Sequence, residues 1–129
     1  MIQNIVVARV RSREARFYAP RFARIDLGHP EPSNLGLAGS RLIDSWEKRI
    51  SSGTDYIYAA NAIPCQVLGY AVLLGKSYDA DPLFCVNKLV DDDGQIVLDA
   101  LINAIESRKN DAAIVQAYMR TSEVSDRQI

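Results

Sequence analysis

The sequence has few of the residues that build metal sites and disulfide frameworks. Its 129 residues include only two cysteines, Cys65 and Cys85, and one histidine, His29. Two cysteines are too few for a disulfide framework, and they lack metal-site spacing. Nothing in the sequence brings either thiol to His29 as a catalytic pair, which favours a histidine in a surface turn. We therefore expect no metal, and a reducing cytoplasm as the location.

Long hydrophobic runs and a secretory signal are also missing. The longest apolar stretches, such as 70–74, are far shorter than the ~20 residues of a membrane helix. No charged segment followed by an apolar one opens the chain, so no secretory signal is expected. Hydrophobic residues make up 48% of the chain, which is typical of globular proteins. A single domain over residues 1–129, with no membrane contact, is therefore expected.

Charge is balanced overall but uneven along the chain. The formal net charge is −1, yet residues 1–25 hold six arginines and a single acid, Glu14. Such a segment indicates a surface for phosphates, nucleic acid or an acidic partner. The alternative is that the arginines decorate the solvent face of a strand and a helix. Nucleic acid is not favoured, because no aromatic residues interleave the basic ones in a binding motif. The six arginines are Arg9, Arg11, Arg13, Arg16, Arg21 and Arg24.

Hydrophobic periodicity predicts a mixed α/β (α+β) fold, with a mostly antiparallel central sheet and helices on both faces. Helix 13–26 contains Pro20, which predicts a kink or an early stop. Asp92 and Gln95 have the spacing of a capping box, which predicts a well-marked start for helix 95–108. In chain order, we expect a strand at 5–11, helices at 13–26 and 35–50, strands at 56–60, 67–74 and 83–90, a helix at 95–108 and a strand at 112–119.

The predicted core follows the apolar stripes of these helices. Helix 13–26 would bury Phe17, Ala19, Phe22, Ala23 and Ile25, and helix 35–50 would bury Leu35, Ala38, Leu42, Trp46 and Ile50. Helix 95–108, ended by 110–111, would bury Val97, Leu98, Leu101, Ile102, Ala104 and Ile105.

This order of elements resembles the GNAT superfamily of N-acyltransferases over roughly residues 4–129. The hairpin 56–74 contains Gly69-Tyr70-Ala71-Val72-Leu73, where the family often has valine–glycine–tyrosine or valine–glycine–phenylalanine. Strand 83–90 and helix 95–108 are similar to its central strand and acyl-CoA-binding helix. The resemblance implies transfer of an acyl group from acyl-CoA, or another acyl thioester, to the amine of a small molecule or protein.

The resemblance also implies where the site lies. An amide N–H at 86–88 would polarise the thioester carbonyl. Tyr118 or Tyr70, on adjacent strands, would protonate the leaving thiolate, although a core tyrosine with a satisfied hydroxyl is the alternative. The implied donor-binding residues are Val86, Asn87, Lys88, Gly94, Gln95 and Ile96.

The sequence departs from the family at the start of its acyl-CoA-binding helix. The family has Arg/Gln-x-x-Gly-x-Gly/Ala, whereas residues 90–96 here contain one glycine and the aspartates Asp91, Asp92 and Asp93. These carboxylates would repel a phosphate lying nearby. The alternative is an acidic helix cap that stabilises the fold. We therefore expect ordinary acetyl-CoA to bind weakly, and the sequence leaves open whether the domain is catalytically active.

The chain stops before the family's last two strands, so a truncated or degenerate member is expected. The edge of strand 112–119 would then be exposed, and Val115, Tyr118 and Met119 would add apolar surface. Exposed edges of this kind pair with other chains, which predicts a homo-oligomer, with a homodimer as its simplest form.

A second interpretation is a non-catalytic, ferredoxin-like β-α-β-β-α-β interaction module that dimerises or docks an acidic partner. This interpretation leaves the strand at 83–90 and the helix at 13–26 as extra elements. A cleft between strands 83–90 and 112–119 would favour the acyltransferase, whereas an unbroken sheet would favour the module.

Overall fold

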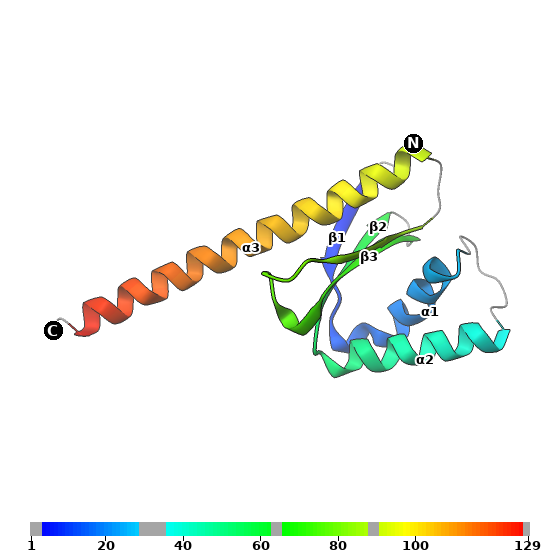
Figure 1. The fold of residues 1–129 in the computed structure, drawn as a ribbon, viewed down its shortest axis with the longest axis horizontal. Helices are drawn as coiled ribbons and strands as arrows, with labels where there is room; N and C mark the ends of the chain where they lie inside the picture. The colour runs from blue at the N-terminus through cyan, green and yellow to red at the C-terminus, as the bar shows by residue number, and fades with distance from the viewer. Residues whose placement is uncertain (1–3, 29–35, 63–65, 88–90, 128–129) are drawn as a thin grey trace.

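The computed structural model describes residues 4–28, 36–62, 66–87 and 91–127. They form one antiparallel sheet of four strands in the order β1-β2-β3-β4, covered by helices on both faces (Figure 1). The predicted mixed class is confirmed, as is the antiparallel hairpin at its centre. The strands are β1 (Ile5–Arg9), β2 (Tyr56–Ala62), β3 (Gln66–Leu73) and β4 (Leu83–Val86).

Two helices cover one face of the sheet and a third crosses the other. The first face carries α1 (Ala15–Asp26) and α2 (Gly36–Ser52), and the second carries α3 (Asp91–Arg127). Short 3₁₀ turns, η1 (Ser12–Glu14) and η2 (Leu74–Lys76), follow β1 and β3. Together, these elements match the predicted order through the third helix.

Side chains of β2 alternate between two cores, as the two-residue period of a strand requires, and those of β3 also face both cores, with an irregularity in the register at Leu68. On β2, Ile57 and Ala59 pack with α1 and α2, whereas Tyr58 and Ala60 pack with α3. The first core contains the rings of Phe22, Trp46 and Tyr70, and the second contains Leu68, Val97 and Leu101. Both central strands are therefore buried on both faces.

The structure corrects two expectations for α1. The helix does not stop at Pro20 but runs to Asp26, because its buried face continues past the proline and packing stabilises the helix there. Phe17 does not point inward: it is 41% exposed, while the next residue, Tyr18, is 5% exposed. Each residue turns the helix by about 100°, and Tyr18 shares its face with Phe22.

The largest correction concerns α3. It begins at Asp91 rather than Gln95, and it continues through 110–111 and 112–119, where an end and a strand were predicted. Gln95 donates a hydrogen bond from Nε2 to Asp99 Oδ1 at 2.8 Å, whereas the Asp92 side chain of the predicted capping box lies outside the described ones. The segment at 112–119 contains three alanines, which favour helix, and among the described residues no strand runs beside it.

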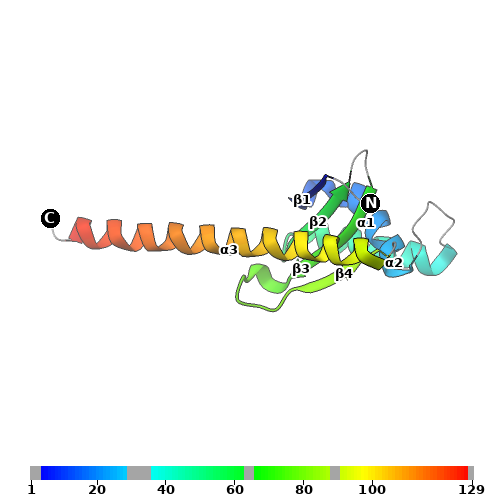
Figure 2. The same cartoon turned by 90° about the horizontal axis from the view of Figure 1, so that it is seen from above.

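The buried stripe of α3 is narrower than predicted. Val97, Leu101 and Ile105 are buried, but Leu98 is only half-buried and Ile102 is 38% exposed. All residues from Glu106 to Asp111 are exposed, and Figure 2 shows the helix leaving the sheet along this stretch. Among the side chains that the structure describes, those of α3 beyond Ile105 therefore belong to neither core.

The loss of strand 112–119 changes two further expectations. A ferredoxin-like sheet would need this strand, so the described β1-β2-β3-β4 sheet does not have that topology. The expected sheet edge for dimerisation is likewise replaced by a helix. Formation of a homo-oligomer stays a prediction.

Candidate functional site

The end of β4 and the start of α3 form a corner with unused polar groups. Asn87 follows β4 directly, and its backbone N–H donates to Leu68 O at 2.7 Å. The residue is 5% exposed, and its Oδ1 atom is buried with no hydrogen-bond partner among the described residues. Because a buried polar atom without a partner is costly, Asn87 provides an acceptor that a bound group can satisfy.

The backbone of Val86 is directed toward the open edge of the sheet. Val86 pairs with Gly69 on β3, and Asn87 is the next residue along. In an antiparallel ladder, successive residues direct their N–H and C=O groups to opposite sides. Since the amide of Asn87 bonds to β3, that of Val86 points away from it. Among the described residues, β4 is the last strand on this side, so this amide and carbonyl are available to a ligand.

Gly69 allows β3, β4 and α3 to meet closely at this corner. A Cβ atom on Gly69 would lie 2.9 Å from Cys85 O and 3.1 Å from Val97 Cγ1. Real Cβ atoms essentially never approach a backbone oxygen so closely, and neither neighbour is the end of a flexible chain. The glycine is therefore a packing requirement of the site.

We expect Gly69→Ala to lower the free energy of unfolding by about 1–3 kcal/mol, as other overpacked sites do. Gly94→Ala is the matched control, because a Cβ there would lie 3.9 Å from Val86 Cγ1, an ordinary contact. Alanine in a helix should leave stability unchanged or raise it by up to ~1 kcal/mol. Urea unfolding followed by circular dichroism measures both, and equal stability of the two variants would contradict the packing argument.

The structure brings together part of the predicted donor site. Val86 and Asn87 are adjacent, and Gly94 lies beside Val86 in the first turns of α3. Ile96 is 43% exposed, and the side-chain amide of Gln95 donates its hydrogen bond to Asp99. Lys88 lies outside the described residues.

Tyr70 belongs to the core between the sheet and the helices α1 and α2. Its hydroxyl donates a hydrogen bond to Asp26 Oδ1, while Trp46 Nε1 donates to Asp26 Oδ2 at 2.7 Å. Burial, followed by the hydrogen bond to Asp26, raises the pKa of Tyr70 well above its usual value. This geometry matches the alternative that the sequence allowed, a core tyrosine with a satisfied hydroxyl. Asp26 itself carried no recognisable signal in the sequence.

Tyr118 does not lie on a strand next to Tyr70. It is part of α3, about 40 Å along the helix from Asp91 at about 1.5 Å per residue. The cleft between strands 83–90 and 112–119 that would favour the acyltransferase is therefore not formed in the described part of the chain, because residues 112–119 are helical. Placing Tyr118 and Tyr70 on adjacent strands was wrong, because the second strand is helical.

Within the part of the chain that the structure describes, the remaining candidate groups do not assemble into a metal or thiol site. Cys85 is a free, half-buried cysteine. Burial raises the pKa of its thiol, although a hydrogen bond with Tyr70 acts in the opposite direction. No three histidine, cysteine or acidic side chains come together as metal ligands in the described ranges. His29 and Cys65 lie outside the described residues.

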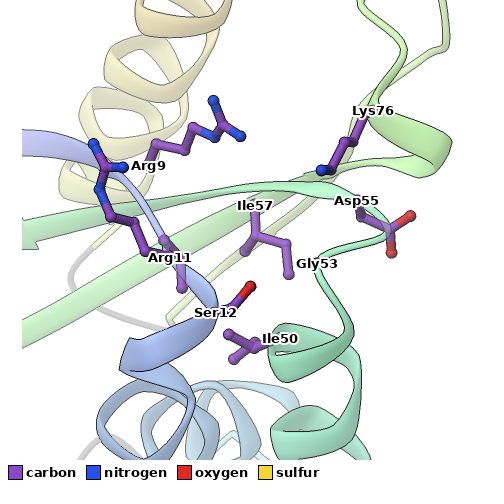
Figure 3. Close-up of a pocket in the computed structure, with 9 residues that line it drawn as sticks. Arg9, Arg11, Ser12, Ile50, Gly53, Asp55, Ile57 and Lys76 are labelled. Atoms are coloured by element: carbon purple, nitrogen blue, oxygen red, sulfur yellow. The ribbon is translucent and has the colours of Figure 1, made fainter.

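A basic hollow of about 180 Å³ lies at the opposite end of the sheet (Figure 3). Its walls come from the end of β1, from η1, from the turn between α2 and β2, and from η2. Arg9, Arg11 and Lys76 supply positive charge around it, and the buried Ile50 and Ile57 supply apolar surface. Figure 3 shows Arg9 and Lys76 reaching toward each other from opposite sides. The excess of arginine in residues 1–25 indicated such a basic surface. It did not indicate that Lys76 of η2 also lines it.

The single carboxylate lining this hollow is already neutralised. Asp55 accepts a hydrogen bond from Arg49 Nε at 3.0 Å and another from the Gly75 amide at 2.9 Å. Burial acts to raise the pKa of Asp55, but these hydrogen bonds and the charge of Arg49 outweigh it and lower the pKa below its ordinary value. Asp55 therefore stays ionised and paired, and it does not offset the charge of Lys76.

Within the described ranges, no helix combines the length and the apolar character needed to cross a membrane. Comparison with known proteins found no matching family model, no matching curated protein and no matching solved structure.

Proposed function

We propose that this chain binds an acyl thioester along the open edge of β4 and transfers its acyl group to an amine, as a GNAT-type N-acyltransferase. One observation carries the proposal: the amide and carbonyl of Val86, which have no backbone partner among the described residues, face the open edge directly beside the start of α3. Extended ligands recognise such edges through main-chain hydrogen bonds. The arm of an acyl-CoA is extended and contains amide groups of its own.

In this proposal, the amide of Val86 polarises the thioester carbonyl. The amine attacks the carbonyl carbon, the carbon–sulfur bond breaks and the thiolate leaves, and the proton lost by the amine passes through solvent to the thiolate, which is released as a thiol. A fixed backbone N–H stabilises the negative charge that develops on the oxygen. The buried Oδ1 atom of Asn87 would accept a hydrogen bond from an N–H group of the donor or of the amine.

Tyr70 is a poor acid for this reaction. Its proton is held by Asp26, and its raised pKa disfavours release. Among the groups that the structure describes, catalysis would therefore rest on positioning and on the amide of Val86. Orienting two reactants can by itself supply a large part of an enzyme's rate enhancement.

The three aspartates at the start of α3 should make binding of acetyl-CoA weak. Replacing Asp91, Asp92 and Asp93 by serine removes their repulsion of the phosphates and keeps the backbone amides of the helix start. We expect this triple variant to bind acetyl-CoA about tenfold or more tightly than the wild type, because 1.4 kcal/mol corresponds to a factor of ten. Isothermal titration calorimetry at modest salt measures both affinities.

Asp79→Ser with Asp81→Ser is the matched control, since both aspartates precede β4 and lie at the other end of that strand. This variant should bind like the wild type. Submicromolar binding by the wild type would contradict the repulsion argument. Absence of binding in every variant would contradict the proposed function itself.

A further inference from the structure

The basic hollow lies far from the corner where the acyl donor is proposed to bind. In the antiparallel sheet, Arg9 ends β1 opposite Tyr58 near the start of β2. Val86, by contrast, ends β4 opposite Gly69 near the start of β3. The two sites therefore lie at opposite ends of the sheet, and the hollow plays no part in the proposed acyl transfer.

From this geometry we propose that the hollow binds the phosphate group of a small phosphomonoester. Two cations reach toward it from separate parts of the chain, Arg9 at the end of β1 and Lys76 in η2, and Arg11 also lines it (Figure 3). Among the described residues, none of the three is ion-paired with a carboxylate. A dianionic phosphate suits this surplus, because it accepts several charge-assisted hydrogen bonds.

The guanidinium of Arg9 and the backbone of Lys76 are held in place before any ligand arrives. The guanidinium of Arg9 lies 4.2 Å from the centre of the Tyr56 ring, a cation–π contact that restricts its rotamers. Lys76 has a left-handed backbone with φ of 56°, which is rare for a residue with a side chain. The turn before it is fixed by the hydrogen bond from the Gly75 amide to Asp55. Such preorganisation lowers the entropy cost of binding.

The hollow also contains a neutral donor and room for a small organic group. The hydroxyl of Ser12 lies at its wall, and a Cβ atom on Gly53 would come within 3.0 Å of Ser12 Oγ. A side chain at position 53 would therefore crowd this hydroxyl. Ile50 and Ile57 offer apolar surface to the carbon atoms of the ester. At about 180 Å³, the hollow is smaller than the roughly 300–1,000 Å³ of most ligand pockets, so the ligand is a small one.

Titration of the full chain with inorganic phosphate and with glycerol phosphate, at constant ionic strength, tests the proposal. Isothermal titration calorimetry should show saturable binding of both, with glycerol phosphate at least as tight. We expect Lys76→Gln and Arg9→Gln each to weaken binding about tenfold, as loss of a hydrogen bond to a charged group does. Lys76 is exposed, so its substitution keeps the fold even if that of Arg9 does not. Circular dichroism checks both variants.

Arg16→Gln is the matched control, because Arg16 belongs to the same arginine-rich segment but does not line the hollow, and its side chain is 94% exposed. Binding should be unchanged in this variant. Equal weakening by Arg16→Gln, or tight binding of an RNA oligonucleotide without binding of phosphate, would overturn the proposal in favour of diffuse charge. Absence of saturable phosphate binding by the wild type would also overturn it. None of these variants alters Val86 or α3, so the result is independent of acyl donor binding.

Discussion

Replacing Leu101 by alanine is expected to lower the free energy of unfolding by about 2–5 kcal/mol, as in other cores where a buried leucine is truncated. Leu101 is fully buried in the core that joins α3 to the sheet, with Val97, Ile105 and Leu68. Its loss removes apolar surface from the core and leaves a cavity that the packed sheet can fill only in part. Urea unfolding followed by circular dichroism measures the change.

The adjacent residue provides the control for this prediction. Ile102 is 38% exposed, and Ile102→Ala should lower stability by less than about 1 kcal/mol, in the range of surface substitutions. Equal losses for Leu101→Ala and Ile102→Ala would mean that α3 packs on a different face from the one described.

Phe22→Ala is expected to lower the free energy of unfolding by about 3–5 kcal/mol. The ring of Phe22 is fully buried on the opposite face of the sheet. Its centre lies 5.1 Å from that of Trp46, 4.8 Å from that of Tyr70 and 5.4 Å from that of Tyr18. Truncation would remove three ring contacts at once, each contributing beyond the area it buries. The tryptophan fluorescence of the folded state should change as well, because Trp46 loses a neighbour.

Phe17→Ala is the matched control, with the same chemical change on the same helix. Phe17 is 41% exposed, and its ring contacts the guanidinium of Arg21 at 3.8 Å. An exposed cation–π contact is worth about 0.5–1 kcal/mol, so this variant should lose about that much. A larger loss for Phe17→Ala than for Phe22→Ala would reverse the assignment of the buried face of α1.

Part of the candidate site could be predicted from the sequence. The resemblance of the strand at 83–90 and the following helix to the GNAT pattern led to Val86, Asn87 and Gly94, which the structure brings together. Of the two described residues in the stretch 86–88, Asn87 donates its amide to β3, so the proposal uses the amide of Val86. That distinction depends on which residues of β4 direct their amide groups toward β3. The sequence alone does not show which of two successive residues does so.

Other features had no local signal. Asp26 receives hydrogen bonds from Trp46 and Tyr70, which are 20 and 44 residues away. In the basic hollow, Lys76 meets Arg9 only because β2 and β3 pair and return η2 to the end of β1. Contacts between such distant residues follow from strand register, which a single sequence does not report.

Local patterns alone determined the strands and helices up to the third helix. The amphipathic period of 36–52 and the hydrophobic hairpin of 56–73 are clear enough to predict these elements without knowledge of the packing. The segment at 112–119 was different, because its alanine, β-branched and aromatic residues suit either a helix or a strand. A strand needs a neighbour to pair its backbone, whereas a helix satisfies its own backbone hydrogen bonds. Among the described residues no strand lies beside this segment. The helix is therefore favoured at 112–119 because of the tertiary structure and not because of the local sequence.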